Sequence, residues 1–109
     1  MTVEPEPGAR QKRLGVFWKK YLRLWRGGVS ALSAFAVIAE EERDPELKEV
    51  AASLGRAMGE GQSLTEAMQA HGAVFSPSAV ALIRAAEQHG EWDAALTELS
   101  DGLLEGTFD

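Results

Sequence analysis

The chain has 109 residues, of which 45% are hydrophobic and 26% are charged, and its formal net charge is −6. This length and composition predict one globular domain, and the absence of cysteine excludes a disulfide framework, a thiol nucleophile and a thiolate metal site. Residues 1–30 carry seven basic and two acidic side chains, whereas residues 31–109 carry four and fifteen. The acidic excess argues against a nucleic-acid partner, because it repels phosphates.

The first thirty residues divide into a tail and an amphipathic helix. Residues 1–10 are acidic and proline-rich and predict a flexible tail, whereas residues 11–106 predict the folded domain and residues 107–109 a short C-terminal tail. Apolar residues follow helical spacing over residues 11–26, with basic residues on the opposite face. The predicted apolar stripe is Leu14, Phe17, Trp18, Tyr21, Leu22 and Trp25.

The next two helices are bounded by clear start and stop residues. Gly27-Gly28 separates the first helix from residues 29–41, whose mostly apolar run of eleven residues is about half of what a bilayer span needs. We therefore expect a core helix. Asp44-Pro45 supplies an N-cap and an N1 proline for a third helix that ends near residue 60. Its predicted buried stripe is Leu47, Val50, Ala51, Leu54 and Met58.

Glycine and serine mark the joint that follows. Gly61 suits a left-handed residue just past a helix end, and Ser63 with Glu66 forms a predicted capping box. The fourth helix is expected at residues 64–71, closed by Gly72. Its inward residues are Leu64, Ala67 and Met68.

The last two helices form a second pair with a glycine joint. Ser76-Pro77 predicts the start of a fifth helix that runs to residue 89 and ends at Gly90. Acidic residues then open the sixth helix, where they complement the helix dipole. The predicted core positions are Val80, Ile83, Ala86, Trp92, Ala95, Leu96, Leu99 and Leu103. No segment alternates with the period of a strand, so we predict an all-α, compact six-helix bundle built from antiparallel hairpins.

The residue pattern predicts no enzyme and no cofactor. His71 and His89 lie at predicted helix ends, where an imidazole interacts well with the last carbonyls, and neither has a spaced His or Cys partner. Ser63 and Ser76 are better explained as helix caps than as nucleophiles. Catalytic residues are therefore predicted to be absent.

Four segments at the predicted breaks between helices resemble the cytoplasmic helical domain of type II secretion system F proteins and of their type IV pilus platform relatives. They are residues 27–32 (Gly-Gly-Val-Ser-Ala-Leu), 60–68 (Glu-Gly-Gln-Ser-Leu-Thr-Glu-Ala-Met), 75–77 (Phe-Ser-Pro) and 86–93 (Ala-Glu-Gln-His-Gly-Glu-Trp-Asp). The expected signature residues are Gly28, Gly61, Ser63, Glu66, Pro77, Glu87, Gly90 and Asp93. The sequence departs from the family pattern at Ala86, where the family has glycine, and at Trp92, where it has leucine.

This resemblance covers about residues 17–104 and implies a non-catalytic protein–protein interaction domain. Family members connect an assembly ATPase to inner-membrane secretion or pilus components and self-associate. The resemblance therefore implies a homodimer and a cytoplasmic location at the inner membrane. Many members carry membrane spans and two copies of the domain, whereas this sequence shows one copy and no span.

Glu87 has two interpretations. Helical spacing from Val80 and Ile83 places it on the apolar stripe, where we expect it to accept N–H groups at the start of the sixth helix. The resemblance implies another role, because the matching family glutamate can help to bind calcium near a subunit interface. Calcium takes about six to eight oxygens, so Glu91, Asp93 or a second copy would have to complete its shell.

The basic face of the first helix is the predicted interaction surface, formed by Lys19, Lys20, Arg23 and Arg26. It could dock on an acidic surface of another protein or of a second copy. The alternative is a peripheral adaptor on an anionic membrane surface, with Trp18, Tyr21 and Trp25 at the headgroup level. Periodicity favours a third reading, in which these aromatic residues belong to the core and the cations are solvated.

Overall fold

The computed structural model describes residues 8–108, and all regular structure over that range is α-helical. The helices are α1 (Ala9–Arg26), α2 (Ala31–Glu41), α3 (Pro45–Gly59), α4 (Leu64–Gln69), α5 (Pro77–His89) and α6 (Trp92–Glu105). The predicted all-α bundle is confirmed. Residues 1–7 and 109, which hold most of the predicted N-terminal tail and the end of the C-terminal one, lie outside the described residues.

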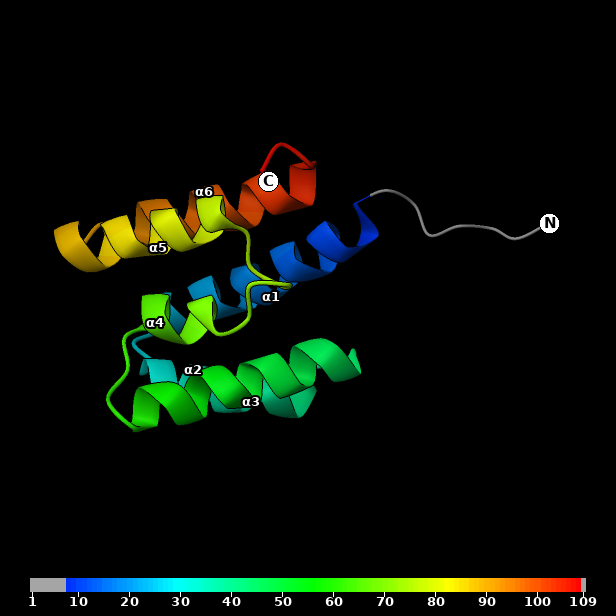
Figure 1. The fold of residues 1–109 in the computed structure, drawn as a ribbon. Coiled ribbons are helices and arrows are strands. Elements are labelled where there is room, and N and C mark those ends of the chain that lie inside the picture. Colours follow the sequence, from blue (N-terminus) through cyan, green and yellow to red (C-terminus); the bar gives the residue numbers. More distant parts are fainter. Residues whose placement is uncertain (1–7, 109) are drawn as a thin grey trace.

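The helices form three layers with α1 in the middle (Figure 1). The antiparallel pair α5 and α6 lies on one side of α1 and α4, and the antiparallel pair α2 and α3 lies on the other. The most extensive contacts join α1 to α6 and α2 to α3. α1 also contacts α2, and α4 contacts both α3 and α5, so these two helices connect the hairpins.

Aromatic residues of α1 form the centre of the core. Phe17, Trp18 and Tyr21 are at most 3% exposed. The Tyr21 ring stacks on Phe35 of α2 with centroids 4.6 Å apart, and the Trp18 ring lies 5.7 Å from Phe75. The interpretation as core is confirmed for Trp18 and Tyr21, which are therefore not available for a membrane surface, whereas Trp25 is only partly buried.

The apolar stripes predicted for the other helices are largely correct. Met58, Trp25 and Trp92 are only partly buried. The predicted stripe residues that are buried are Leu14, Leu22, Leu47, Val50, Ala51, Leu54, Leu64, Ala67, Met68, Val80, Ile83, Ala86, Ala95, Leu96, Leu99 and Leu103.

Local sequence signals set both glycine joints. Gly61 and Gly90 have φ angles of 97° and 76°, in the left-handed region that favours glycine. After Gly61, the Ser63 hydroxyl accepts the N–H of Glu66, and the Glu66 carboxylate accepts the N–H of Ser63, each at 3.1 Å. The predicted capping box is confirmed, and these hydrogen bonds hold the pKa of Glu66 below its usual value.

Side-chain caps also begin α3 and α5 where the sequence predicts them. Asp44 accepts the N–H groups of Glu46 and Leu47 at 2.9 and 3.2 Å. Ser76 accepts the N–H of Ala79 at 3.1 Å, directly before Pro77 at the first helical position. Each helix start leaves four N–H groups without an intrahelical partner, and these caps satisfy two of them in α3 and one in α5.

Four boundaries differ from the expectations, and one of them is the start of α2, which begins at Ala31 after the N-cap Ser30 and not at residue 29. Ala9 and Arg10 already belong to α1, so this part of the predicted tail is helical. The fourth helix ends at Gln69 with Ala70 as its C-cap, and Gly72 lies in the following turn. Beyond α6, the N–H of Phe108 donates to the carbonyl of Gly102 at 3.1 Å, and the Phe108 ring packs against the core.

Gly15 allows α1 to approach α6 closely, and the sequence patterns do not reveal this contact. A Cβ at this position would lie 2.7 Å from Cγ and 2.9 Å from the backbone nitrogen of Leu104 in α6. Glycine inside a helix costs about 0.5–1 kcal/mol relative to alanine. The contact between α1 and α6 explains its presence here.

Candidate functional site

The predicted basic surface of α1 is engaged within the chain. Lys19 forms an ion pair with Asp101 of α6. On the opposite flank, Lys20 Nζ lies 3.3 Å from the Glu41 carboxylate at the end of α2. These two neighbours in sequence therefore reach to different hairpins.

Arg26 makes the most specific of these contacts. Its Nε and one terminal nitrogen donate to the two carboxylate oxygens of Asp93 at 2.7 and 2.8 Å, and the Thr97 hydroxyl lies nearby at 3.3 Å. The hydrogen bonds from Arg26 hold the pKa of Asp93 below its usual value, and the same contact raises the pKa of Arg26. Asp93 lies in the first turn of α6 as predicted, and it also ties that turn to the end of α1.

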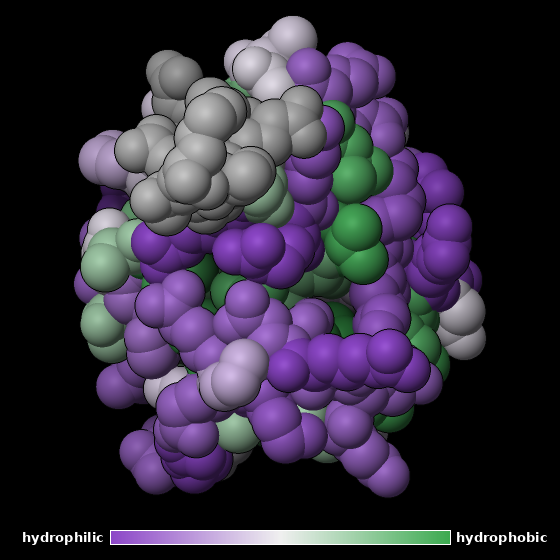
Figure 2. All heavy atoms as spheres, turned by 90° about the vertical axis from the view of Figure 1, so that its right-hand side faces the viewer, coloured by the Kyte–Doolittle hydropathy of each residue, from purple (hydrophilic) through white to green (hydrophobic). Residues whose placement is uncertain are grey.

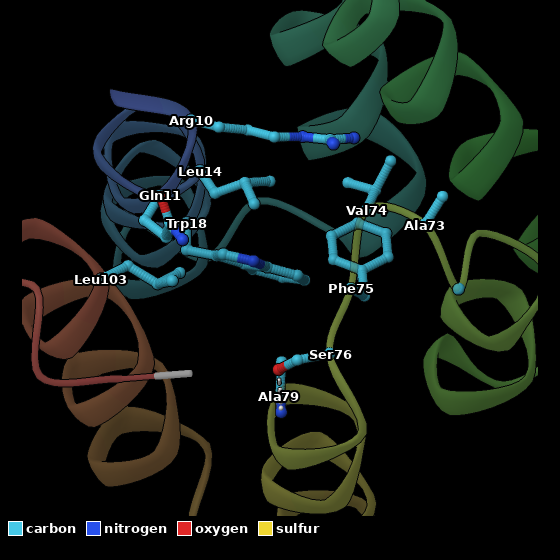
Figure 3. A pocket seen from close by; sticks show the side chains of 11 residues that line it. Arg10, Gln11, Leu14, Trp18, Ala73, Val74, Phe75, Ser76, Ala79 and Leu103 are labelled. Atoms are coloured by element: carbon cyan, nitrogen blue, oxygen red, sulfur yellow. Dashed lines mark hydrogen bonds between the residues drawn. The ribbon is translucent and has the colours of Figure 1, made fainter. Parts of the chain in front are cut away.

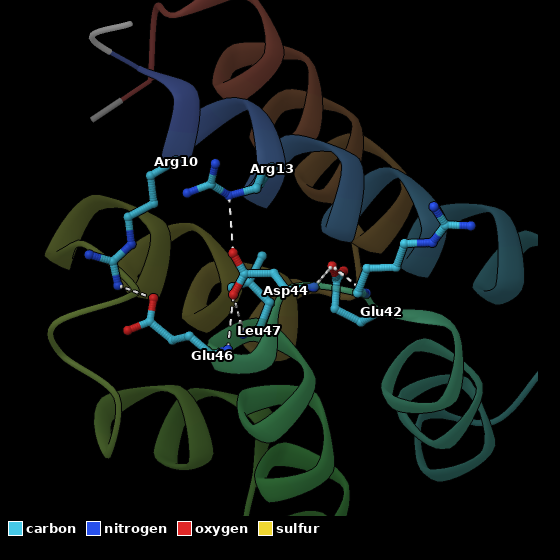
Figure 4. Close-up of polar contacts among 7 residues, drawn as sticks. Arg10, Arg13, Glu42, Asp44, Glu46 and Leu47 are labelled. Atoms are coloured by element: carbon cyan, nitrogen blue, oxygen red, sulfur yellow. Dashed lines mark hydrogen bonds and ion pairs between the residues drawn. The ribbon is translucent and has the colours of Figure 1, made fainter. Parts of the chain in front are cut away.

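The N-terminal part of α1 contacts the start of α3 in the same way (Figure 4). Arg10 lies 2.8 Å from the Glu46 carboxylate, and Arg13 lies 3.2 Å from the carboxylate of Asp44, the N-cap residue. All these pairs are partly or largely exposed, so each is expected to contribute little energy. Their arrangement nevertheless joins α1 to both hairpins.

Arg23 differs from the other three residues of the predicted surface. It is exposed and forms no ion pair within residues 8–108. The charge division of the sequence thus has a structural counterpart, because most cations of α1 meet acidic residues of α2, α3 and α6. Of the predicted surface, Arg23 is thus the cation without an ion pair to any carboxylate in residues 8–108.

Glu87 connects α5 to α4, and this corrects the expected contact with α6. Its carboxylate accepts the N–H of Thr65 at 3.0 Å and also accepts the Thr65 hydroxyl. Thr65 lies in the first turn of α4 and is 6% exposed. A carboxylate is favourable at any helix start, and the structure brings the start of α4 to this side chain. The helical spacing of Glu87 along α5 could not show whether it contacts the start of α4 or the start of α6.

Tyr21 lies in the electrostatic field of the same carboxylate. Burial raises the pKa of Tyr21 to about 12, and the negative charge of Glu87 adds to this effect. The phenol is therefore held in its neutral form by its position in the core.

The three carboxylates considered for calcium do not form a cation shell. Glu87 binds Thr65, Asp93 binds Arg26, and Glu91 is the N-cap residue of α6 without a side-chain cap hydrogen bond. No group of three or more His, Cys, Asp or Glu residues within residues 8–108 is arranged to hold a metal ion. The residues present do not fit the calcium role that the resemblance implies for a single chain.

The two histidines occupy different environments. His71 lies beyond the end of α4, and its Nε2 is 2.9 Å from the Ser53 hydroxyl of α3, so it bridges helices instead of capping one. His89 is the last residue of α5, as predicted.

All four signature segments lie at joints of the structure. Gly28, with a φ angle of 81°, separates α1 from α2, and Gly61 separates α3 from α4. Pro77 begins α5, and Gly90 ends it. The residues that carry the resemblance therefore set the directions in which the helices leave their turns.

Comparisons with known proteins agree with this geometry. None of the helices described here combines the length and apolar character needed to cross a membrane. A search of curated proteins gave no match. The family model described as type II secretion system (T2SS), protein F matches residues 18–107, a range that contains all four joints. The chain therefore belongs to the type II secretion system protein F family.

Proposed function

We propose that this chain is a non-catalytic protein–protein interaction module of a type II secretion or type IV pilus platform. In this role it connects an assembly ATPase to inner-membrane components at the cytoplasmic face of the membrane, and it self-associates as a dimer. The match to the protein F family over residues 18–107 carries the proposal. The role requires no metal and no cofactor.

The described surface supports contact through helix faces. The joints are fixed by caps and left-handed glycines, so the helices present rigid outer surfaces. Rigid surfaces reduce the entropy that binding must overcome. The rigid helix faces of this fold are thus suited to binding a protein partner.

Arg23 is the residue through which we expect the basic face to contact a partner. Lys19, Lys20 and Arg26 would have to leave in-chain carboxylates, whereas Arg23 is paired with no carboxylate of the described part of the chain. An acidic partner surface or the acidic part of a second copy would provide the complementary charge. We expect substitution here to slow association more than it changes stability.

The membrane-surface alternative loses part of its basis. The aromatic residues that would lie at the headgroup level include Trp18 and Tyr21, which are 0% and 3% exposed. The cations that would attract anionic lipid are mostly paired with carboxylates of the chain. These contacts favour a protein partner over a lipid surface.

Co-purification from cells that make the whole apparatus tests the proposal. We expect the tagged chain to retain the assembly ATPase or an inner-membrane component, and light scattering at tens of micromolar to show a dimer. Arg23→Glu should weaken retention, whereas Arg84→Glu, a matched change at an exposed arginine of α5, should not. Retention of no secretion or pilus component, together with a strict monomer, would refute the proposed role.

A further inference from the structure

A cavity of about 290 Å³ opens at the end of the molecule where α1 begins. Leu14, Trp18 and Phe75 provide apolar walls, while Arg10 and Gln11 lie on its polar side (Figure 3). Figure 2 shows this end of the molecule, where apolar residues are visible between hydrophilic ones. The volume lies near the lower end of typical ligand cavities, which start at about 300 Å³. It therefore suits one side chain or a very small molecule.

Trp18 contributes an unsatisfied hydrogen-bond donor to this region. Its indole N–H is buried and has no hydrogen-bond partner within the described residues. The rings of Phe17 and Tyr21 meet Trp18 edge to face, and ring faces are weak acceptors compared with a carbonyl oxygen. Native proteins rarely leave a buried donor without an acceptor, so this N–H requires an explanation.

We propose that the cavity binds an apolar side chain of a partner polypeptide, and that the Trp18 indole N–H donates to a backbone carbonyl of the same segment. The proposal rests on the proposed interaction role and names one site for it. An apolar pocket beside a polar rim is the arrangement in which a single anchor side chain contributes most to binding. The backbone carbonyl adjacent to an anchor supplies the acceptor that Trp18 lacks.

Part of the cavity wall must move to admit this carbonyl, because the indole nitrogen is shielded from water. Residues 70–75 contain turns without a helix and are held by backbone hydrogen bonds such as those from Val74 and Phe75 to the His71 carbonyl. The remaining walls belong mainly to helices. Local opening of a turn costs less than displacement of a packed helix.

One side of the cavity is built from residues outside the family match. That match begins at residue 18, whereas Arg10, Gln11 and Leu14 precede it. The wall from the first half of α1 therefore belongs to a segment that the family match does not cover.

Nuclear magnetic resonance of the indole N–H groups tests the site on the whole chain. N-acetyl-leucinamide and N-acetyl-phenylalaninamide serve as probes, because each joins an apolar side chain to amide carbonyls. We expect a saturable downfield shift of the Trp18 signal with millimolar affinity, as suits a ligand of only about ten to fifteen non-hydrogen atoms. The signals of Trp25 and Trp92 should not move.

Cavity-filling variants make the test specific. Ala79→Leu should weaken probe binding at least tenfold, whereas Ala85→Leu, the same change on the exposed part of α5, should leave it unaltered. Ala73→Leu fills the cavity from the exposed loop and replaces Ala79→Leu if that variant does not fold.

Two results would overturn the inference. One is a Trp18 signal that stays unchanged up to the solubility limit of both probes, and the other is a response that the filling variants do not reduce. Probe binding by the isolated chain requires no secretion component. Probe binding can therefore fail while co-purification succeeds, or succeed while co-purification fails, so the two tests distinguish failure of this inference from failure of the proposed function.

Discussion

The two faces of α1 stabilise the fold in different ways. Phe17, Trp18 and Tyr21 are at most 3% exposed, whereas the side chains of Lys19 and Arg26 are 26% and 52% exposed and pair with carboxylates. Apolar burial supplies energy in proportion to area, while exposed ion pairs contribute little. The comparison indicates that the aromatic face holds the bundle together and that the basic face fixes how the hairpins sit around α1.

The largest effect is expected for truncation of the aromatic face. Trp18→Ala removes a fully buried ring that contacts Phe35 and Phe75, and should destabilise the fold by about 3–5 kcal/mol. Urea unfolding followed by circular dichroism measures this change. A loss below about 1 kcal/mol would show that the aromatic face does not organise the core.

A second apolar truncation tests whether the α5–α6 hairpin depends on the same kind of burial. Leu96 of α6 is 0% exposed, so Leu96→Ala should cost about 2–5 kcal/mol in the same unfolding experiment. A change below about 0.5 kcal/mol, typical of surface positions, would mean that α6 is not packed on the core as described.

High pH should weaken the aromatic face in a defined window. The folded-state pKa of Tyr21 is about 12 and the unfolded value is about 10, so its contribution is fully present below pH 10 and is lost as pH rises towards 12. The expected loss is about 2–3 kcal/mol. Denaturant unfolding between pH 9 and 12 measures it, with Tyr21→Phe as the reference. Identical pH profiles for the two proteins would contradict the assignment.

The polar corner between α4 and α5 should show an intermediate effect. Glu87→Ala leaves the buried Thr65 hydroxyl without its acceptor and should cost about 1–2 kcal/mol. A double-mutant cycle with Thr65→Ala isolates the coupling. Additive effects of the two substitutions would show that Glu87 and Thr65 do not interact in solution.

The smallest effect is expected on the basic face. Lys20→Ala should change stability by about 0–1 kcal/mol, because its pair with Glu41 is exposed. Chemical unfolding at low and high salt measures the contribution, which should shrink as salt screens the charges. A loss as large as that of Trp18→Ala would remove the distinction between the two faces.

Local sequence signals account for most of the fold. Ser63, Ser76 and Asp44 cap helices where their positions predict, since a cap satisfies N–H groups only a few residues away. The glycine joints are predictable for the same reason. Periodicity likewise predicts which side of α1 is buried, because the helical repeat alone places Trp18 on the apolar face and Lys19 on the basic face.

The contacts between distant segments could not be predicted from spacing. The starts of α4 and α6 both offer N–H groups that the Glu87 carboxylate could accept. Only the packing of α4 against α5 determines that Glu87 binds Thr65. The basic residues of α1 appear solvated in a helical projection, yet packing brings Asp101 and Glu41 to them. The cavity beside Trp18 also depends on a loop that approaches from another part of the chain.

The titration of Asp93 is the most direct test of the claim that the basic face of α1 is engaged within the chain. We predict by carboxyl-detected magnetic resonance that the pKa of Asp93 lies below the ordinary value of about 3.9, and that Arg26→Gln returns it towards that value. Its stabilising contribution is present above the unfolded-state pKa and is lost as pH falls through the folded-state pKa. An ordinary Asp93 pKa that does not respond to Arg26→Gln would contradict the account.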